Sequence, residues 1–168
     1  MAGIANLSPT HGYTNADTFP MVIGDFNGDG KTDVGRVHGS GVAVALSTGT
    51  GWTWMNGLPS FGPSQGCTSA SIYPIFTGDF NGDGKMDVGR VHGSGVAFML
   101  SDGNGGWVPM AGIANLSPTH GYRDAGTFPM VIGDFNGDGR TDVGRVHGSG
   151  VAVALSTGTG WTWMNGLP

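Results

Sequence analysis

The chain has 168 residues, a net charge of −5 and a pI near 5.2, and this balance excludes the basic footprint that nucleic-acid binding requires. Cys67 is the lone cysteine, which excludes an intrachain disulfide, and no apolar run approaches the about 18 residues of a membrane-spanning helix. Glycine accounts for 34 residues and glutamate is absent, so the composition disfavours helices and predicts an all-β fold with many tight turns.

The elements of the first part of the chain can be followed in order. A long polar connection covers Ser8–Thr18. The four strands expected after it are Phe19–Gly24, Asp33–His38, Val42–Ser47 and Trp52–Met55. The first strand is a continuous apolar run, as a buried inner strand should be, and the third and fourth strands alternate. Glycine-containing segments separate the strands and predict hairpin turns.

The same order of elements recurs twice more. The hexapeptide that begins at Asp25 returns at Asp79 and Asp134, at spacings of 54 and 55 residues. The additional residue is a glycine within a turn of the middle copy. Copies one and three differ at only four of 59 aligned positions, which are Thr14/Arg123, Asn15/Asp124, Asp17/Gly126 and Lys31/Arg140. Such identity indicates recent duplication or deliberate engineering.

Four antiparallel strands in each unit of this length are typical of a β-propeller blade, with a β-sandwich as the runner-up. The expected blade repeats run over about residues 1–54, 55–109 and 110–168 of a single repeat array. Propellers close with about four to eight blades, so three blades do not close. We therefore expect two chains to assemble head to tail as a homodimer that completes a six-bladed ring. The chain ends agree with this expectation, because residues 1–4 are in phase with residues 164–167.

Each repeat contains an aspartate-rich loop of the form D-x-N-x-D-G-x-x-D. Ca²⁺ prefers about six to eight oxygen ligands, which positions 1, 3, 5 and 9 supply with side chains and position 7 with its carbonyl, while the position-7 side chain can point to solvent. We expect about three Ca²⁺ per chain, held by Asp25, Asn27, Asp29, Lys31 and Asp33; by Asp79, Asn81, Asp83, Lys85 and Asp87; and by Asp134, Asn136, Asp138, Arg140 and Asp142.

The alternative is a metal-free turn, because Asp, Asn and Gly all favour turns. That alternative does not explain three carboxylates in one nine-residue loop, which repel one another without a cation. An EF-hand is excluded, because position 12 holds arginine in all three copies where a bidentate glutamate is required.

The run G-D-F-N-G-D-G-[KR]-x-D resembles the FG-GAP or VCBS repeat of integrin-α-type propellers and of many bacterial secreted proteins. This resemblance covers essentially the whole chain and implies a calcium site between the first two strands of each blade and a secreted, extracellular protein. The N-terminal residues themselves show no signal-peptide pattern. A weaker similarity, in Gly12-Tyr13, Gly121-Tyr122 and Gly39-Ser-Gly-Val42, is to fungal propeller lectins related to Psathyrella velutina lectin.

The hairpins after the second strands and the connections are expected on the opposite face from the aspartate loops. Polar donors beside an aromatic ring suit a sugar, so the candidate ligand-binding residues are His11, Tyr13, His38, Ser40, His92, Ser94, His120, Tyr122, His147 and Ser149. The alternative is that these histidines only bond neighbouring turns. The tryptophans of the fourth strands are expected to pack between blades, with a glycan platform as the alternative.

The sequence shows no nucleophile–base motif, and we expect no enzyme. The function it favours is a calcium-stabilised, non-catalytic binding module that is lectin-like and multivalent. The alternative is a structural or protein-interaction scaffold, including an engineered symmetric propeller without a natural ligand.

Overall fold

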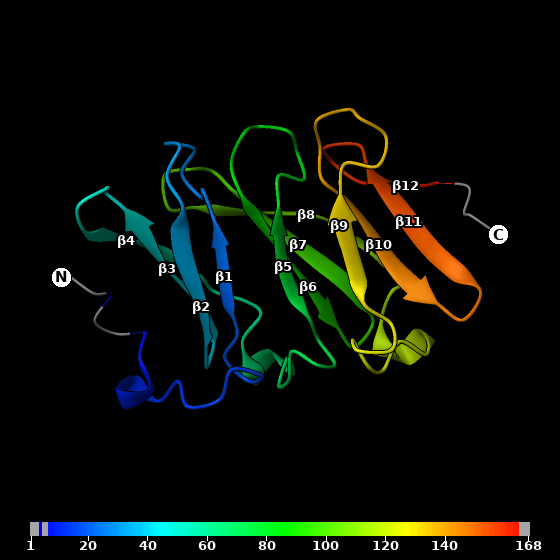
Figure 1. Cartoon of the computed structure of the whole chain (residues 1–168), viewed down its shortest axis with the longest axis horizontal. Coiled ribbons are helices and arrows are strands. Elements are labelled where there is room, and N and C mark those ends of the chain that lie inside the picture. Colours follow the sequence, from blue (N-terminus) through cyan, green and yellow to red (C-terminus); the bar gives the residue numbers. More distant parts are fainter. Residues whose placement is uncertain (1–3, 5–6, 165–168) are drawn as a thin grey trace.

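The computed structural model describes Ile4 and residues 7–164. Within these residues twelve strands form three four-stranded antiparallel sheets that follow one another along the array (Figure 1). Blade one contains β1 (Met21–Gly24), β2 (Asp33–His38), β3 (Gly41–Ser47) and β4 (Trp52–Leu58). Blade two contains β5 (Ile75–Gly78), β6 (Asp87–His92), β7 (Gly95–Ser101) and β8 (Trp107–Ile113), and blade three contains β9 (Met130–Gly133), β10 (Asp142–His147), β11 (Gly150–Ser156) and β12 (Trp161–Trp163).

The expected all-β class and the three four-stranded blades are confirmed. Each connection carries one 3₁₀ turn, at η1 (Pro9–His11), η2 (Pro63–Gln65) and η3 (Pro118–His120). Among the described residues no helix has the length and apolar character needed to cross a membrane. The repeat ranges counted from residue 1 include these connections, and their boundaries, 54/55 and 109/110, lie inside β4 and β8. Most of the in-phase chain ends lie outside the described residues.

The ends of the blades differ in their loops. The β1–β2 and β3–β4 turns lie at one end of each sheet, and the β2–β3 hairpin and the connection with its 3₁₀ turn lie at the other, as Figure 1 shows. In the aspartate loop Gly28 and Gly30 adopt φ values of 75° and 83°, which favour glycine. At the other end Gly41 allows the Leu58 carbonyl to approach where a Cβ would collide with it.

The hydrophobic core lies between the blades rather than inside any one of them. We call the boundary between blades one and two the first seam, and that between blades two and three the second seam. At each seam a buried phenylalanine meets a tryptophan of the next blade, with ring centroids 6.1 Å apart for Phe26 and Trp107 and 6.0 Å for Phe80 and Trp161. The expected packing of tryptophan between blades is therefore confirmed for Trp107 and Trp161. It is wrong for Trp54 and Trp163, which are 52% and 49% exposed.

An arginine of the second strand attaches each connection to the blade that follows it, fully buried in blades two and three and half-buried in blade one. Arg90 is fully buried and donates to the carbonyl oxygens of Phe61, Cys67 and Tyr73 at 2.5, 3.0 and 3.1 Å. Arg145 makes the same three contacts in blade three, whereas in blade one Arg36 donates to two carbonyls, those of Leu7 and Tyr13, within the described part of the chain. Because these guanidinium groups bond to backbone, they position the connections that line the candidate site.

Candidate functional site

The first aspartate of each loop organises the loop backbone. The Asp25 carboxylate accepts hydrogen bonds from the amides of Gly28, Asp29 and Gly30, at 2.7, 3.0 and 2.6 Å. Asp79 and Asp134 make the same three contacts in blades two and three. Asn27 Oδ1 also accepts from the Asp29 amide, at 3.2 Å. Side-chain oxygens from positions 1 and 3 therefore converge on one point of the loop.

The last aspartate of each loop is buried beneath it. Asp87 is fully buried, and its two carboxylate oxygens accept from the backbone amides of Phe80 and Ser101, at 2.9 and 2.8 Å. Burial, with a smaller contribution from the negative charges of Asp83 and Asp79, raises the pKa of Asp87 to about 7, although the two amide contacts lower it. The loop thus concentrates negative charge around a carboxyl group that is poorly solvated.

A basic side chain lies on each loop. Lys31 Nζ is 3.0 Å from Asp29 Oδ2, and the corresponding distances are 2.8 Å for Lys85 and Asp83 and 2.6 Å for Arg140 and Asp138. The position-7 side chain is partly exposed to solvent, as it could be by the sequence, but its cationic end turns to the position-5 carboxylate, which attracts it.

The donor chemistry of the loops fits a hard divalent cation such as Ca²⁺. All the candidate donor atoms are oxygens, two of them already converge, and a cationic side chain stands at the position-5 carboxylate. As the side chains are arranged, no three His, Cys, Asp or Glu residues of the described part of the chain gather closely enough to hold a metal ion. Ion binding would therefore require the position-5 carboxylate to turn from the basic side chain into the loop.

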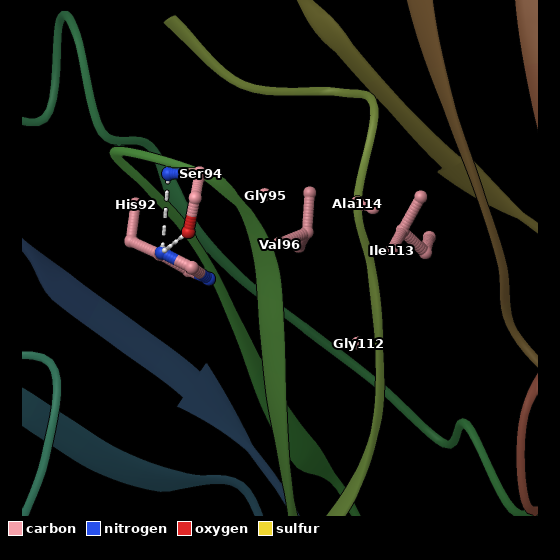
Figure 2. A pocket seen from close by; sticks show the side chains of 7 residues that line it. All are labelled: His92, Ser94, Gly95, Val96, Gly112, Ile113 and Ala114. Atoms are coloured by element: carbon pink, nitrogen blue, oxygen red, sulfur yellow. Dashed lines mark hydrogen bonds between the residues drawn. The ribbon is translucent and has the colours of Figure 1, made fainter. Parts of the chain in front are cut away.

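The histidine and serine of each β2–β3-type hairpin are brought together at the opposite end of the blades. Ser94 donates its backbone amide to Nδ1 of His92 at 3.4 Å, and its Oγ lies 3.3 Å from the same atom (Figure 2). The same pairing joins His38 with Ser40 and His147 with Ser149. Burial lowers the pKa of His38 and of His92, which favours their neutral form at physiological pH.

The candidate residues of the connections have other partners. Nδ1 of His11 lies 3.1 Å from Ser8 Oγ, and that of His120 lies 2.8 Å from Ser117 Oγ, within their own 3₁₀ turns. The rings of Tyr13 and Tyr122 each lie 5.0 Å from the arginine guanidinium carbon of their blade, and each packs edge-on against a phenylalanine. The tyrosines therefore brace the arginine contacts.

Two clefts open at the hairpin end of blade two. The hairpin cleft has a volume of about 260 Å³, and Figure 2 shows His92 and Ser94 on one side of it and Ile113 and Ala114 on the other; its lining is His92, Ser94, Gly95, Val96, Gly112, Ile113 and Ala114. The seam cleft has a volume of about 350 Å³ and is lined by Ile72, Tyr73, Gly93, Pro118, Thr119 and Arg123. It joins the hairpin of blade two to the connection that enters blade three.

Sequence reasoning grouped each connection with the hairpin of its own copy and so missed the residues of the seam cleft. Gly93 of one blade meets Thr119 and Arg123 of the next connection there. A signal for this region was present in the sequence. Three of the four differences between copies one and three, including the one at Arg123, fall within four consecutive positions of the connection.

Comparisons with known proteins agree with this architecture. A family model described as FG-GAP-like repeat matches residues 25–89 and 79–144, which together span 120 of the 168 residues. The solved structure of an Agrocybe aegerita lectin, reported for its specific recognition of non-reducing terminal N-acetylglucosamine, is similar with a TM-score of 0.86 and 23% identity over 99% of this chain and 42% of that chain. Both resemblances inferred from the sequence are thereby confirmed.

A pore structure of the Photorhabdus luminescens Tc holotoxin is also similar, with a TM-score of 0.60 and 17% identity over 86% of this chain and 7% of that chain. No curated protein sequence matches. The chain thus spans less than half of the lectin chain and a small part of the toxin chain, and at these identities the likeness concerns the fold.

Proposed function

The chain belongs to the FG-GAP-like repeat family, and on this premise we propose that it is a calcium-stabilised β-propeller module that binds carbohydrate and catalyses no reaction. The observation that carries the proposal is the pair of clefts at the hairpin end, where polar donors stand beside apolar and aromatic side chains. We place the module outside the cell, in accordance with the family, and we propose that it works as a homodimer.

The proposed calcium ligands are the side chains at positions 1, 3, 5 and 9 and the carbonyl at position 7 of each loop, as expected from the sequence. A divalent cation would supply the positive charge that the crowded carboxylates lack. The raised pKa of Asp87 supports this, because it reflects burial and like-charge repulsion that a bound cation would offset. Extracellular calcium modules bind the ion with dissociation constants of about 10⁻⁴–10⁻³ M, which suits the proposed location.

Thermal unfolding and calorimetry test the calcium proposal. Calcium at about 100 times its dissociation constant should stabilise the folded protein by about 2.7 kcal/mol per site, and titration should give about three ions per chain. Asp83→Asn should reduce that number by about one. Asp124→Asn, which alters an exposed turn of the connection at the opposite end of the blade from the loops, is the matched control. An unchanged melting temperature in calcium and in chelator would rule out the calcium sites.

The two clefts suit a single sugar ring. Their volumes, about 260 and 350 Å³, lie near the lower limit of about 300 Å³ for small-molecule sites. His92 and Ser94 can bond to hydroxyl groups in the hairpin cleft, and Arg123 can do so beside Tyr73 in the seam cleft. The lectin named above, which shares the fold, is reported to recognise a terminal sugar, so terminal residues of glycans are the proposed ligand class.

A glycan array followed by titration tests this proposal. The array should include glycans that end in N-acetylglucosamine and in other terminal sugars. Arg123→Thr introduces the residue that copy one has at the aligned position and should weaken binding at the seam cleft about tenfold, equivalent to about 1.4 kcal/mol. Val108→Ala alters an exposed side chain outside both clefts and should have no effect. No binding above background would refute the carbohydrate proposal and favour the scaffold alternative.

A further inference from the structure

The two seams are built from one repeated set of contacts in which blade n accepts and blade n+1 donates. A backbone amide bonds to the carbonyl of the loop aspartate, a serine hydroxyl to the carbonyl of the next phenylalanine, and a tryptophan Nε1 to a carbonyl near the end of the fourth strand. In the first seam these are Met86 to Asp25, Ser101 to Phe26 and Trp107 to Asn56, at 2.8, 2.6 and 3.0 Å; in the second they are Thr141 to Asp79, Ser156 to Phe80 and Trp161 to Ala111, at 2.7, 2.5 and 2.7 Å.

Blade one and blade three each have one face with no neighbouring blade in the described structure, and we call these the open faces. The two open faces carry the two halves of this same set of contacts. By the repeat spacing, blade one presents the donor half, with the Thr32 amide, the Ser47 hydroxyl and Trp52 Nε1. Blade three presents the acceptor half, which includes the Asp134 and Phe135 carbonyls. The open faces are therefore complementary to each other, because each lacks what the other presents.

Apolar residues that are buried at the seams have exposed equivalents at the open faces. Phe26 and Phe80 are fully buried at the seams, whereas the equivalent Phe135 is 42% exposed. Trp52 is 36% exposed, although the equivalent tryptophans pack against phenylalanine, and on β1 Met21 and Ile23 are 51% and 61% exposed. Each open face is thus one half of a hydrophobic seam.

The third aspartate loop is also incomplete in the single chain. The side chain of Lys85 lies against Gly28 of the first loop, because its Cγ is 3.2 Å from the position that a Cβ would take on that glycine. Arg140 lies against Gly82 of the second loop in the same way, at 3.0 Å. At the equivalent Gly137 nothing lies within 4 Å of such a Cβ among the described residues. The side chain that would cover Gly137 by the repeat is Lys31, which stands at the opposite end of the array.

We infer that a second copy of this chain docks head to tail, with the open face of its blade one on the open face of blade three, and the reverse. The seam then places Trp52 of one copy against Phe135 of the other and Lys31 against the third aspartate loop. Six is the only multiple of three within the about four to eight blades of closed propellers, so two copies close the ring. The interface depends on the seam contacts and on neither the calcium nor the sugar proposal.

Mass measurement in solution tests this docking. The wild-type chain should have twice its mass of 17.1 kDa, about 34 kDa, by light scattering and native mass spectrometry. Trp52→Asp alters only the donor face and Phe135→Asp only the acceptor face, and each should reduce the mass to that of one chain. The matched control is Trp163→Asp, because Trp163 is 49% exposed although the neighbouring blade is in place, and it should remain a dimer.

Mixing the two single-face variants distinguishes the proposed arrangement from other dimers. The acceptor face of the Trp52→Asp chain and the donor face of the Phe135→Asp chain are both intact, so the mixture should form a heterodimer through one seam. Circular dichroism of each variant checks that it is folded. A monomeric wild type, or dimerisation that only one of the two face variants weakens, would overturn the inference, since a head-to-head dimer would use one face only.

Discussion

The arginines of the second strands offer a quantitative test of how the connections are held. Arg90 and Arg36 occupy equivalent positions in β6 and β2, but Arg90 is fully buried with three carbonyl acceptors. Arg36 is half-buried and donates to the carbonyls of Leu7 and Tyr13, at 3.0 and 3.2 Å, and its buried Nε has no hydrogen-bond partner within the described structure. Replacing each by methionine keeps much of the side-chain volume and removes the charge and the donors.

The expected cost follows from the carbonyls left behind. Each buried acceptor that loses its partner costs about 1–3 kcal/mol. The substitution also removes the cost of burying the guanidinium charge, which offsets several kcal/mol of the total. For Arg90→Met we expect a net loss of about 2–4 kcal/mol in the free energy of unfolding, and for Arg36→Met about 1–2 kcal/mol. The larger loss at Arg90 reflects its additional acceptor, the Tyr73 carbonyl that stands beside the seam cleft.

Urea unfolding followed by tryptophan fluorescence measures both variants. Repeat arrays can unfold in parts, so hydrogen exchange of β2 and β6 should accompany it to locate the loss. Arg90→Met should increase exchange in β6 more than Arg36→Met does in β2. An equal or greater effect of Arg36→Met, or no effect of either change, would refute the argument that the number of backbone acceptors sets the contribution of these arginines.

Two further predictions concern the hairpins and the seams. Since burial lowers the pKa of His92 below its ordinary value of about 6.5, the unfolded chain binds more protons, and the free energy of unfolding should fall as pH falls from about 6.5 toward the folded pKa. Urea titrations at several pH values give the free energy of unfolding as a function of pH, and this dependence should be weaker for His92→Gln than for the wild type. An unchanged pH dependence would contradict the assignment to His92. Trp161→Ala removes the contacts with Phe80 and Phe98 and should cost about 3–5 kcal/mol in urea unfolding. Trp52→Ala in the monomeric Phe135→Asp background should cost much less, and equal losses would contradict the seam assignment.

Much of each blade could be predicted because its causes are local. Turn residues and alternation placed the second strands at the residues observed, Asp33–His38 in blade one, and predicted the third to within one residue. Gly28 and Gly30 could be assigned to a sharp loop because that assignment depends only on the backbone angles of these two residues. The first and fourth strands were less accurate, since β4 extends to Leu58 through pairing with Val42, across an irregularity that the local pattern does not reveal.

The candidate site was less predictable because its members come from different blades. Sequence periodicity could gather His92 with Ser94, which are two residues apart, but not Gly93 with Arg123, which meet only when one blade packs on the next. It also could not assign Tyr13 and Tyr122 to the arginines rather than to a ligand surface, because that depends on where the connection folds back.

By itself the sequence determined the number of blades in the chain, the positions of the aspartate loops and the hairpin pairs, since these depend on residues within a few positions of one another. Only the tertiary structure decided which equivalent residues are buried, because that depends on the presence of a neighbouring blade. Phe80 and Phe135 lie in the same hexapeptide, yet one is enclosed by Trp161 and the other is exposed at the end of the array.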